Sequence, residues 1–514
     1  MPQVRLFSIH KAGIYALYVL FLLLLAYLLN QLDRYCLAIC TQPMAQEIEY
    51  GDQSCLALKN VSKDIRGDVD CPKIKNDPDS CDEQTGTDNK TIVCDYNYNG
   101  NGFQYQLLVG PIFIVIYTFS GIPLGYAADL TNRKNLLAFC LIMWSAMTLL
   151  TGFATEYWHL AVLRFGLGIF EAGCTPFASS IIADYFSEDI RGSALGVYNM
   201  GIYIGYSLSY AFGNFITDAN INGQGWRWTF FISGIPGFAL GALILFTMRE
   251  PERTLNRGEQ AQKSKYEATA LQRLTLAAKQ FLSPSLLLIC IAGSIRNGAG
   301  YVWGFNTQNY FNLYYPNENT GLWFSWIPLV GGSIGVVFGG VISDNVVRTR
   351  GPVARIWVLI FSLLLAAPFA AGTLFLPPPW AFVSQIPCYL FGEMWVGVTL
   401  AVVVELVPSA VRATAVAFYL FIITNIGGNM NLLVSPIEKA SSLKTALYLL
   451  YPGCYVLGAA VFLLSLFVIK RDIKKVKNRE LTDESRQGLL ASDNQEGEED
   501  AINYGSTKRE GEIS

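Results

Sequence analysis

Long runs of apolar residues, separated by short polar connections, dominate the pattern along the 514-residue chain. Each run is close to the ~20 residues that an α-helix needs to cross a bilayer. Several runs contain Gly or Pro, which membrane helices tolerate because neighbouring helices satisfy the freed backbone groups. The pattern predicts an all-α membrane protein with twelve transmembrane helices, at 12–42, 105–128, 135–155, 159–182, 193–217, 227–248, 285–312, 321–343, 355–375, 381–406, 413–437 and 445–469.

Composition agrees with this class of protein. Hydrophobic residues make up 52% of the chain and charged residues 15%, whereas a soluble protein carries about a quarter charged residues. The first apolar run is longer than that of a signal peptide, and no small-residue cleavage site follows it. We therefore expect 12–42 to span the membrane rather than to be cleaved off.

Basic residues distinguish the two sides of the membrane. Three short connections hold no Lys or Arg, at 156–158, 313–320 and 376–380. The connections on the other side hold basic residues, among them Arg133, Lys134, Arg191, Arg348, Arg350 and Arg412. The positive-inside rule therefore predicts that both termini are cytosolic, with 1–11 as the N-terminal segment and 249–284 as a cytosolic linker.

The long connection 43–104 supplies an independent indication of sidedness. It holds four cysteines and two N-x-S/T sequons, namely Cys55, Cys71, Cys81, Cys94, Asn60 and Asn89. Disulfides and N-linked glycans both form on the luminal or extracellular side, which agrees with the distribution of basic residues. Four cysteines allow three pairings, and the sequence leaves the choice between them open.

The chain also repeats itself. The segment DYFSEDIRGSALG, which begins at Asp184, aligns with ELVPSAVRATAVA, which begins at Glu405. This repeat predicts two six-helix halves, at 12–248 and 285–469, joined by 249–284. Parallel repeats of this kind place the substrate site of a transporter at the interface between the halves.

The motif GYAADLTNRK at 125–134 resembles the best-known signature of the major facilitator superfamily, Gly-x-x-x-Asp-x-x-x-Arg-Lys. The usual glycine before the first basic residue is replaced here by Asn132. The resemblance to the superfamily covers about residues 10–470. It implies a secondary transporter in which the two halves rock about a central site.

Within that superfamily the chain most resembles the Spinster family of lipid transporters. The matching segments are NQLDR at 30–34, RFGLGIFEA at 164–172 and IIADYF at 181–186. The cysteine-bearing connection 43–104 departs from that family, and so does the seventh apolar run. The resemblance implies a lipid-like substrate, such as a lysophospholipid or a sphingolipid.

The signature loop suggests a gate on the cytosolic side. Asp129 and Arg133 stand four residues apart, and Asp344 and Arg348 repeat this spacing in the second half. The resemblance implies that Asp129 pairs with a basic group or helix end of the neighbouring bundle and latches the cytosolic side. The alternative is that these arginines only keep the loops in the cytosol.

Charged residues inside apolar runs are candidates for coupling to protons. Asp33 and Arg34 interrupt the first run, and a charge at the centre of a bilayer costs about 2.5–3.5 kcal/mol. Arg164 and Glu171 lie seven residues apart, on one helix face, so we expect them to meet the first pair. Asp33, Glu171 and its repeat counterpart Glu393 are the proton-coupling candidates. A static salt bridge that fixes helix packing is the alternative.

Arginines within the membrane are candidates for binding the substrate. Arg296 lies among small residues in the segment GSIRNGAG. Its guanidinium suits a phosphate or carboxylate, and Arg34 and Arg164 offer the same chemistry. Arg296 is equally well explained as the partner of Glu393, and the sequence does not choose between these roles.

The tail 470–514 begins basic, turns acidic and has few apolar residues, so we expect it to be disordered and cytosolic. The pair Leu489-Leu490 loosely resembles a sorting signal, which leaves the plasma membrane and an endosomal or lysosomal membrane as locations. No Gly-x-x-x-x-Gly-Lys-[Ser/Thr] motif occurs. With two histidines and no cytosolic cysteine pair at ligand spacing, we expect no metal, no cofactor and no nucleic-acid partner.

Three functions remain open from the sequence. The first is a proton-coupled transporter of a lipid-like amphiphile, and the second is a transporter of a small organic anion. The third, from another class, is a transporter-shaped receptor or scaffold that signals through its tail. An enzymatic activity is not expected, because the charged residues lie inside apolar helices and match no catalytic motif. The oligomeric state is left open.

Overall fold

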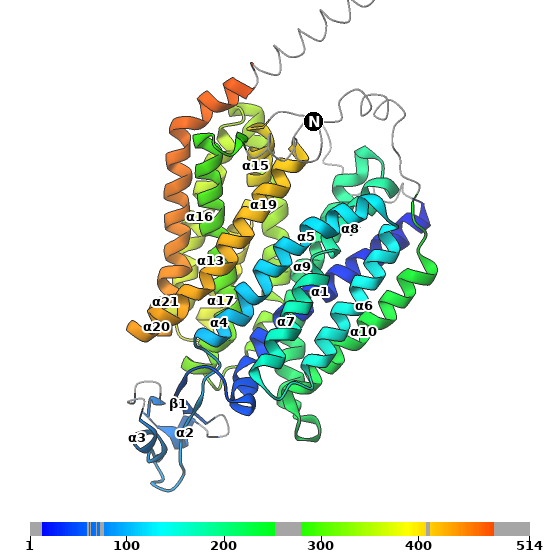
Figure 1. Cartoon of the computed structure of the whole chain (residues 1–514). Helices are drawn as coiled ribbons and strands as arrows, with labels where there is room; N and C mark the ends of the chain where they lie inside the picture. Colours follow the sequence, from blue (N-terminus) through cyan, green and yellow to red (C-terminus); the bar gives the residue numbers. More distant parts are fainter. Residues whose placement is uncertain are drawn as a thin grey trace, which may run out of the picture.

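The fold is described by a computed structural model that covers residues 13–476 and 478, except 59–60, 62, 68, 72–73, 75–76, 252–278 and 408–411. The N-terminal segment 1–11, nearly all of the linker and most of the tail therefore lie outside the described residues. The chain forms two groups of helices, one before residue 252 and one after residue 278 (Figure 1). We call them the N-terminal half and the C-terminal half.

Each half is built from long apolar helices, several of them broken into two. The N-terminal half contains α1 (Ile14–Ile48), α4 (Phe103–Val109), α5 (Pro111–Leu130), α6 (Arg133–Thr151), α7 (Tyr157–Glu171), α8 (Cys174–Tyr185), α9 (Glu188–Ala219) and α10 (Gly225–Thr247). The C-terminal half contains α13 (Pro284–Tyr314), α14 (Thr320–Phe324), α15 (Ser333–Arg350), α16 (Ala354–Phe375), α17 (Trp380–Gly392), α18 (Trp395–Glu405), α19 (Arg412–Asn429), α20 (Val434–Ala440), α21 (Leu443–Leu450) and a last helix over 452–476.

Eleven helical segments of the described chain are long and apolar enough to cross a membrane. The expected segment 193–217 is not among them, although it lies within the 32-residue helix α9. Its sequence mixes apolar residues with Gly, Ser, Asn and Tyr, which lowers its hydropathy. The predicted class of multi-pass helical membrane protein is thus confirmed, while the count of twelve is not.

Close contact between α1 and α9 depends on a glycine. A Cβ atom on Gly205 would lie 2.3 Å from the carbonyl oxygen of Leu28. The two backbones therefore approach to a distance that any larger residue at this position would prevent. Small residues allow such close packing in membranes, where the hydrophobic effect does not drive helices together.

The halves have separate cores that meet at a few residues. One buried apolar cluster runs from Ala16 to Met248 and the other from Phe281 to Ile469. Phe305 of the C-terminal half belongs to the first cluster, whereas Tyr206 and Tyr210 of the N-terminal half belong to the second. The interface between the halves is therefore partly aromatic.

A small disulfide-bonded unit projects from one end of the helices, between α1 and α4 (Figure 1). Strands β1 (Gln53–Ala57) and β2 (Cys94–Tyr98) pair antiparallel, with short helices α2 (Lys63–Arg66) and α3 (Pro78–Asp82) beside them. The structure joins Cys55 to Cys81 and Cys71 to Cys94. Such a small unit buries little apolar surface, so its bridges supply the constraint. We call this the disulfide-bearing end of the molecule.

Candidate functional site

Two helices that face the interface break at a carboxylate. Glu171 is the last residue of α7, and α8 starts at Cys174. In the C-terminal half Glu393 follows the last residue of α17, and α18 starts at Trp395. Both breaks occur at Ala/Gly or Gly/Glu/Met segments in the middle of an apolar run. The repeat thus places one carboxylate at the same kind of helix break in each half.

The carboxylate of Glu171 binds the guanidinium of Arg34. Nη2 and Nε of Arg34 lie 3.1 Å and 3.3 Å from the same oxygen, Oε2, and the Glu171 side chain is 0% exposed. The guanidinium carbon of Arg34 also lies 4.5 Å from the ring centroid of Tyr117 and 5.0 Å from that of Phe113. A cation near the faces of aromatic rings gains a further electrostatic attraction. The expected meeting of the first helix with the charges of the fourth is therefore present.

Arg164 and Asp33 lie beside this pair without joining it. Arg164 donates from Nη1 to the backbone carbonyl of Arg34, at 3.2 Å, rather than to Glu171. Asp33 is 2% exposed, and neither of its carboxylate oxygens accepts a hydrogen bond from a described residue. The second oxygen of Glu171, Oε1, has no partner either. The N-terminal half therefore contains two buried acids with unused hydrogen-bonding capacity.

The C-terminal half holds the matching pair, Arg296 with Glu393. Nη2 of Arg296 lies 3.0 Å from Oε1 of Glu393, and Nη2 and Nε also donate to the carbonyl of Gly392, at 2.6 Å and 3.2 Å. The guanidinium lies 4.9 Å from the ring centroid of Tyr455 and 5.1 Å from that of Trp395. The structure pairs Arg296 with Glu393, which is one of the two roles that the sequence left open.

One tyrosine connects this pair to the other half. Tyr203, on α9, donates its hydroxyl to Oε2 of Glu393 at 3.4 Å. Glu393 remains 21% exposed, in contrast to Glu171. A change in charge at Glu393 would therefore alter a hydrogen bond between the two halves.

The expected gating residues lie at the end opposite the disulfides. Arg133 pairs with Asp184, at 2.6 Å, and with Glu250, at 2.8 Å. Asp129 falls in the last turn of α5, but its side chain lies outside the described residues. The predicted latch through Asp129 thus remains a prediction.

The second half repeats this arrangement with an arginine that the sequence motif did not single out. Arg355, at the start of α16, pairs with Asp344 at 3.0 Å and with Glu405 at 3.0 Å. Arg348 lies in the exposed last turn of α15. The aligned segments at Asp184 and Glu405 already contained a signal for Arg355, because their offset of 221 residues leads from Arg133 to Ala354, one residue before it.

Side-chain amides join the halves near the disulfide-bearing end. Nε2 of Gln106 donates to Oδ1 of Asn306 at 2.8 Å, and Asn306 donates to Asn431 at 3.2 Å. Gln106, Asn306 and Asn431 are each fully buried. The sequence analysis missed these residues, because single amides in apolar runs match no motif.

A second set of contacts lies closer to the disulfide unit. Asn309 donates to Oδ1 of Asn101 at 2.7 Å, and Asn101 donates to Glu438 at 3.1 Å. Lys439 lies 3.1 Å from Asp52. These bonds connect the base of the disulfide unit to α13 and α20, so they hold the halves together at this end.

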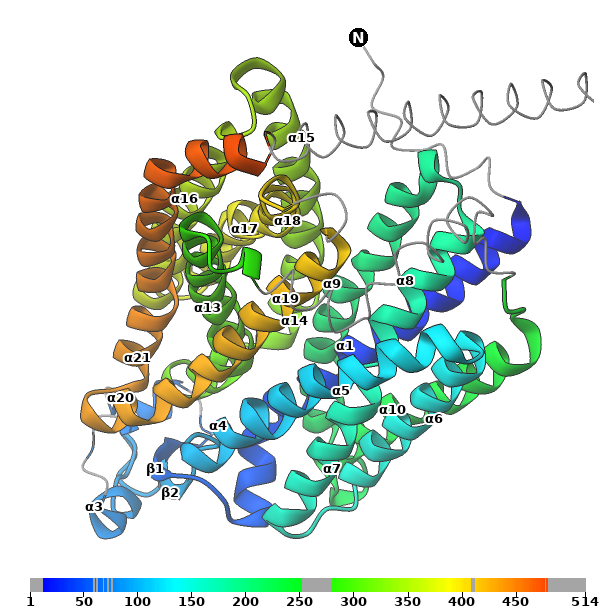
Figure 2. The same ribbon diagram turned by 45° about the horizontal axis from the view of Figure 1, so that its top comes forward.

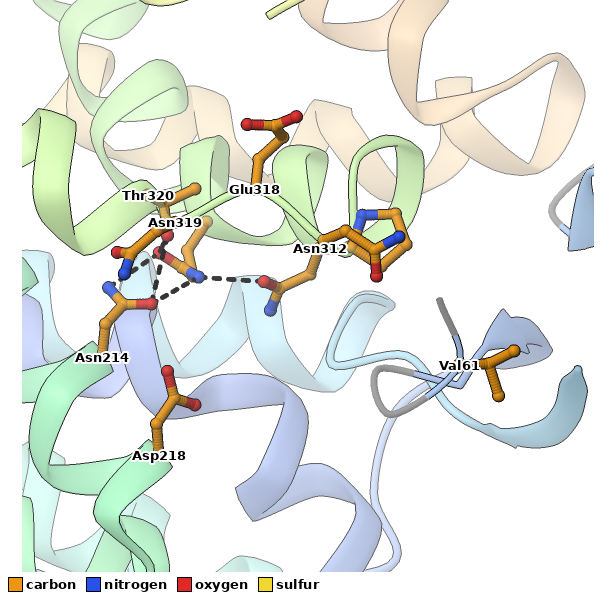
Figure 3. Close-up of a pocket in the computed structure, with 10 residues that line it drawn as sticks. Val61, Asn214, Asp218, Asn312, Glu318, Asn319 and Thr320 are labelled. Carbon is orange, nitrogen blue, oxygen red and sulfur yellow. Dashed lines mark hydrogen bonds between the residues drawn. The ribbon is translucent and has the colours of Figure 1, made fainter. Parts of the chain in front are cut away.

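A polar pocket of about 490 Å³ opens at the same end (Figure 3). Asn214 of α9 exchanges hydrogen bonds with Gln308 of α13, and Thr320 donates to both. The pocket is lined by Val61, Asn214, Asp218, Gln308, Asn312, Pro316, Asn317, Glu318, Asn319 and Thr320. Gln308 also donates to Asn312, so four of the lining side chains bond to one another across this end of the molecule.

The family model described as Major Facilitator Superfamily matches residues 15–430, and the chain belongs to this family of membrane transporters. The sphingosine-1-phosphate transporter SPNS2 of Danio rerio is 28% identical over 327 residues, which are 60% of this chain and 64% of that protein. Protein spinster homolog 1 of Xenopus laevis is 26% identical over 426 residues, 76% of this chain and 78% of that protein. The predicted likeness to Spinster proteins is confirmed.

The fold has solved counterparts. A crystal structure of a bacterial homolog to the human lysosomal transporter Spinster, in an inward-facing and unoccupied conformation, superposes with a TM-score of 0.67. It is 22% identical, and the match covers 90% of this chain and 99% of that one. Together with the apolar helices, these relatives support a multi-pass protein of the plasma membrane or of an endosomal or lysosomal membrane.

Proposed function

We propose that the chain is a proton-coupled secondary transporter that carries a lipid-like amphiphile with an anionic headgroup, such as a lysophospholipid or a phosphorylated sphingoid base. The observation that carries this proposal is the repeated pair of a buried arginine and a carboxylate at a helix break, with aromatic rings against each guanidinium. Such residues inside a membrane are costly and mark substrate or proton pathways. The pairs lie on the helices that alternating access would move against each other.

The two arginines supply the headgroup chemistry. A guanidinium binds phosphate or carboxylate oxygens through parallel N–H donors, which a lysine cannot do. The rings around Arg34 (Phe113 and Tyr117) and Arg296 (Trp395 and Tyr455) offer apolar surface beside each cation. A substrate with a charged head and an apolar chain fits this combination.

Proton coupling follows from the ion pair at Arg34. Two hydrogen bonds of its guanidinium end on one oxygen of Glu171. A proton on Glu171 would cancel the negative charge and release Arg34 to receive the headgroup. Loss of the proton would restore the ion pair and expel the headgroup. Asp33, the neighbouring residue on α1, is the second acid available for this exchange.

The orientation is part of the proposal. With α9 counted beside the eleven apolar segments, the chain crosses the membrane twelve times and returns both termini to the cytosol. The disulfide unit then lies outside, where Asn89 is exposed in a turn with φ 53°. Hydrogen bonds from Thr91 hold the pKa of the neighbouring Asp88 below its usual range. Asn60 lies outside the described residues.

Glycosylation tests this orientation. Asn89→Gln should remove one glycan-sized step in gel mobility from protein made in eukaryotic cells, and Asn60→Gln should remove another. Asp79→Ala, an exposed change in the same unit, serves as the control and should leave the mobility unchanged. If endoglycosidase leaves the wild-type mobility unaltered, the disulfide unit does not carry glycans and the orientation rests on charge and cysteines.

The transport function is tested by uptake into proteoliposomes. The panel comprises a labelled lysophospholipid, a phosphorylated and an unphosphorylated sphingoid base, and a small organic anion, each with and without a pH gradient. We expect gradient-dependent uptake of the phosphorylated amphiphiles, lost in Arg34→Gln and kept in the control Asp79→Ala. Equal uptake of the organic anion would favour the second candidate, a small-anion carrier. No uptake of any compound would overturn the proposal and leave a receptor or scaffold.

A further inference from the structure

The last helix carries a basic face at the end opposite the disulfides. In the helix over 452–476, four basic side chains are exposed, namely Lys470, Arg471, Lys474 and Lys475. Ile469 and Asp472, on the other face, are buried at 1% and 7% exposure. The spacing is that of an amphipathic helix with a basic outer face. The charges thus belong to an ordered surface of the protein.

The same outer face is apolar one turn earlier. Leu464 is 53% exposed and Phe467 is 83% exposed. Arg471 and Lys474 follow Phe467 by four and seven residues, so they extend the same stripe along the helix. A lipid-facing stripe that changes from apolar to basic within one turn passes from the hydrocarbon core to the level of the headgroups.

The orange-red end of this helix bends toward α15 in both views (Figures 1 and 2). Arg348 and Arg350, in the last turn of α15, are exposed at the same end. The basic groups therefore gather over the C-terminal half, where the chain leaves the membrane.

The basic face is tied to the helix that holds the candidate site. Oδ2 of Asp472 accepts hydrogen bonds from the hydroxyl of Ser285, at 2.6 Å, and from its backbone N–H, at 3.2 Å. Ser285 lies at the start of α13, and Arg296 follows on the same helix, about 16 Å further at ~1.5 Å per residue. A force on the basic face would thus reach the helix that carries Arg296.

We propose that this basic face binds anionic phospholipid headgroups of the leaflet in which it lies, and that bound lipid holds the start of α13 in place. In the orientation proposed above, this is the cytosolic leaflet, which is rich in anionic lipids. The inference rests on that orientation and not on the identity of the transported substrate. Four exposed cations beside a lipid-facing stripe complement the negative charge of such a surface, although Arg471 also lies 3.4 Å from Asp472.

Binding to purified protein in detergent tests the proposal without any transport. The probes are fluorescent short-chain phosphatidylserine and phosphatidylcholine, measured by anisotropy at rising NaCl. Lys474→Gln/Lys475→Gln removes two charges from the face. Lys90→Gln/Lys444→Gln removes two charges from the disulfide-bearing end and is the control.

Each basic residue near an anionic surface strengthens binding about fivefold, so the first variant should bind phosphatidylserine at least ~10-fold more weakly. Binding of phosphatidylcholine should stay unchanged in both variants, which also shows that they are folded. Rising salt should weaken only the binding of phosphatidylserine. Equal affinity of the two double variants for phosphatidylserine would overturn the proposal, because the lipid would then bind elsewhere, for example at the central arginines.

The link to α13 has its own readout. Amide hydrogen exchange at 285–289 should slow in wild-type nanodiscs when phosphatidylserine replaces part of the phosphatidylcholine. The same replacement should have no effect on this segment in Lys474→Gln/Lys475→Gln. If the rate of amide exchange at 285–289 in wild-type protein is the same with and without phosphatidylserine, the basic face does not hold α13. That part of the proposal then fails.

Discussion

The two halves stabilise their buried arginines through different hydrogen-bond partners. Arg34 directs both of its strong bonds to one oxygen of Glu171, whose other oxygen has no partner. Arg296 instead shares its donors between Glu393 and the carbonyl of Gly392. Glu171 is 0% exposed, whereas Glu393 is 21% exposed.

This difference assigns different roles to the two pairs. Removing the charge of Glu171 leaves Arg34 with the side-chain oxygen of Asn30, at 3.4 Å, and two ring faces. Removing the charge of Glu393 leaves Arg296 bonded to the backbone carbonyl of Gly392. A side-chain mutation does not remove this carbonyl. In the transport cycle proposed above, the N-terminal pair is therefore the switch, whose state changes with one proton on Glu171, and the C-terminal pair is the more permanent anchor.

The largest effect is expected from removing the charge of Glu171. Glu171→Gln keeps the shape of a protonated glutamate, so substrate exchange across the membrane should persist while uptake driven by a pH gradient falls at least ~10-fold. If Glu171 is only structural, the unpaired Arg34 costs about 3–5 kcal/mol and the folded yield collapses. Yield and the two kinds of transport are measured together. A well-folded variant that still concentrates substrate with a pH gradient would contradict the coupling role.

The second prediction compares the arginines at the opposite end. Arg133→Gln should lower the free energy of unfolding by about 3 kcal/mol, because the Arg133 side chain is 5% exposed and holds two carboxylates. Arg355→Gln should cost about 1 kcal/mol, since its partner Asp344 is 64% exposed. Thermal unfolding of both variants in one detergent gives the difference. Equal losses of unfolding free energy in the two variants would mean that the different burial of the two ion-pair networks does not affect stability.

The third prediction tests the anchor. Glu393→Gln should destabilise the protein by only about 1–2 kcal/mol, because Arg296 retains Gly392 and its two rings. Uptake driven by a pH gradient should fall a few-fold and keep its dependence on the gradient. Uptake assays beside Glu171→Gln provide the comparison. A collapse as complete as that of Glu171→Gln would make the two pairs equivalent.

The smallest effect is expected from the bond between the halves. Tyr203→Phe removes the hydroxyl on Glu393 and should cost about 0.5–1.5 kcal/mol. Because this bond favours the arrangement in which α9 lies against the break between α17 and α18, its loss should change the rate of exchange by less than about tenfold. Tyr18→Phe, which removes a hydroxyl bond within one half, is the matched control. Identical exchange rates in the two variants would show that the Tyr203 hydroxyl does not affect the movement of the halves relative to each other.

The sequence by itself determined the membrane class, the repeat and the location of the charged residues. The membrane class and the charged positions depend on local properties, namely the length of apolar runs and the spacing of residues along one helix. The repeat is seen by comparing two segments of the chain. Arg164 and Glu171 share a face because they are seven residues apart, and Asp33 and Arg34 face them because lipid would not accept their charges. Neither inference requires knowledge of how the helices pack.

The tertiary structure alone decided which groups pair. It chose Arg34 over Arg164 as the partner of Glu171, Glu393 as the partner of Arg296, and one of three disulfide pairings. It also revealed the amides that join the halves, such as Gln106 and Asn306. These partners lie on elements far apart in the chain, so their distances follow from how the helices pack. No periodicity within a single helix encodes that packing.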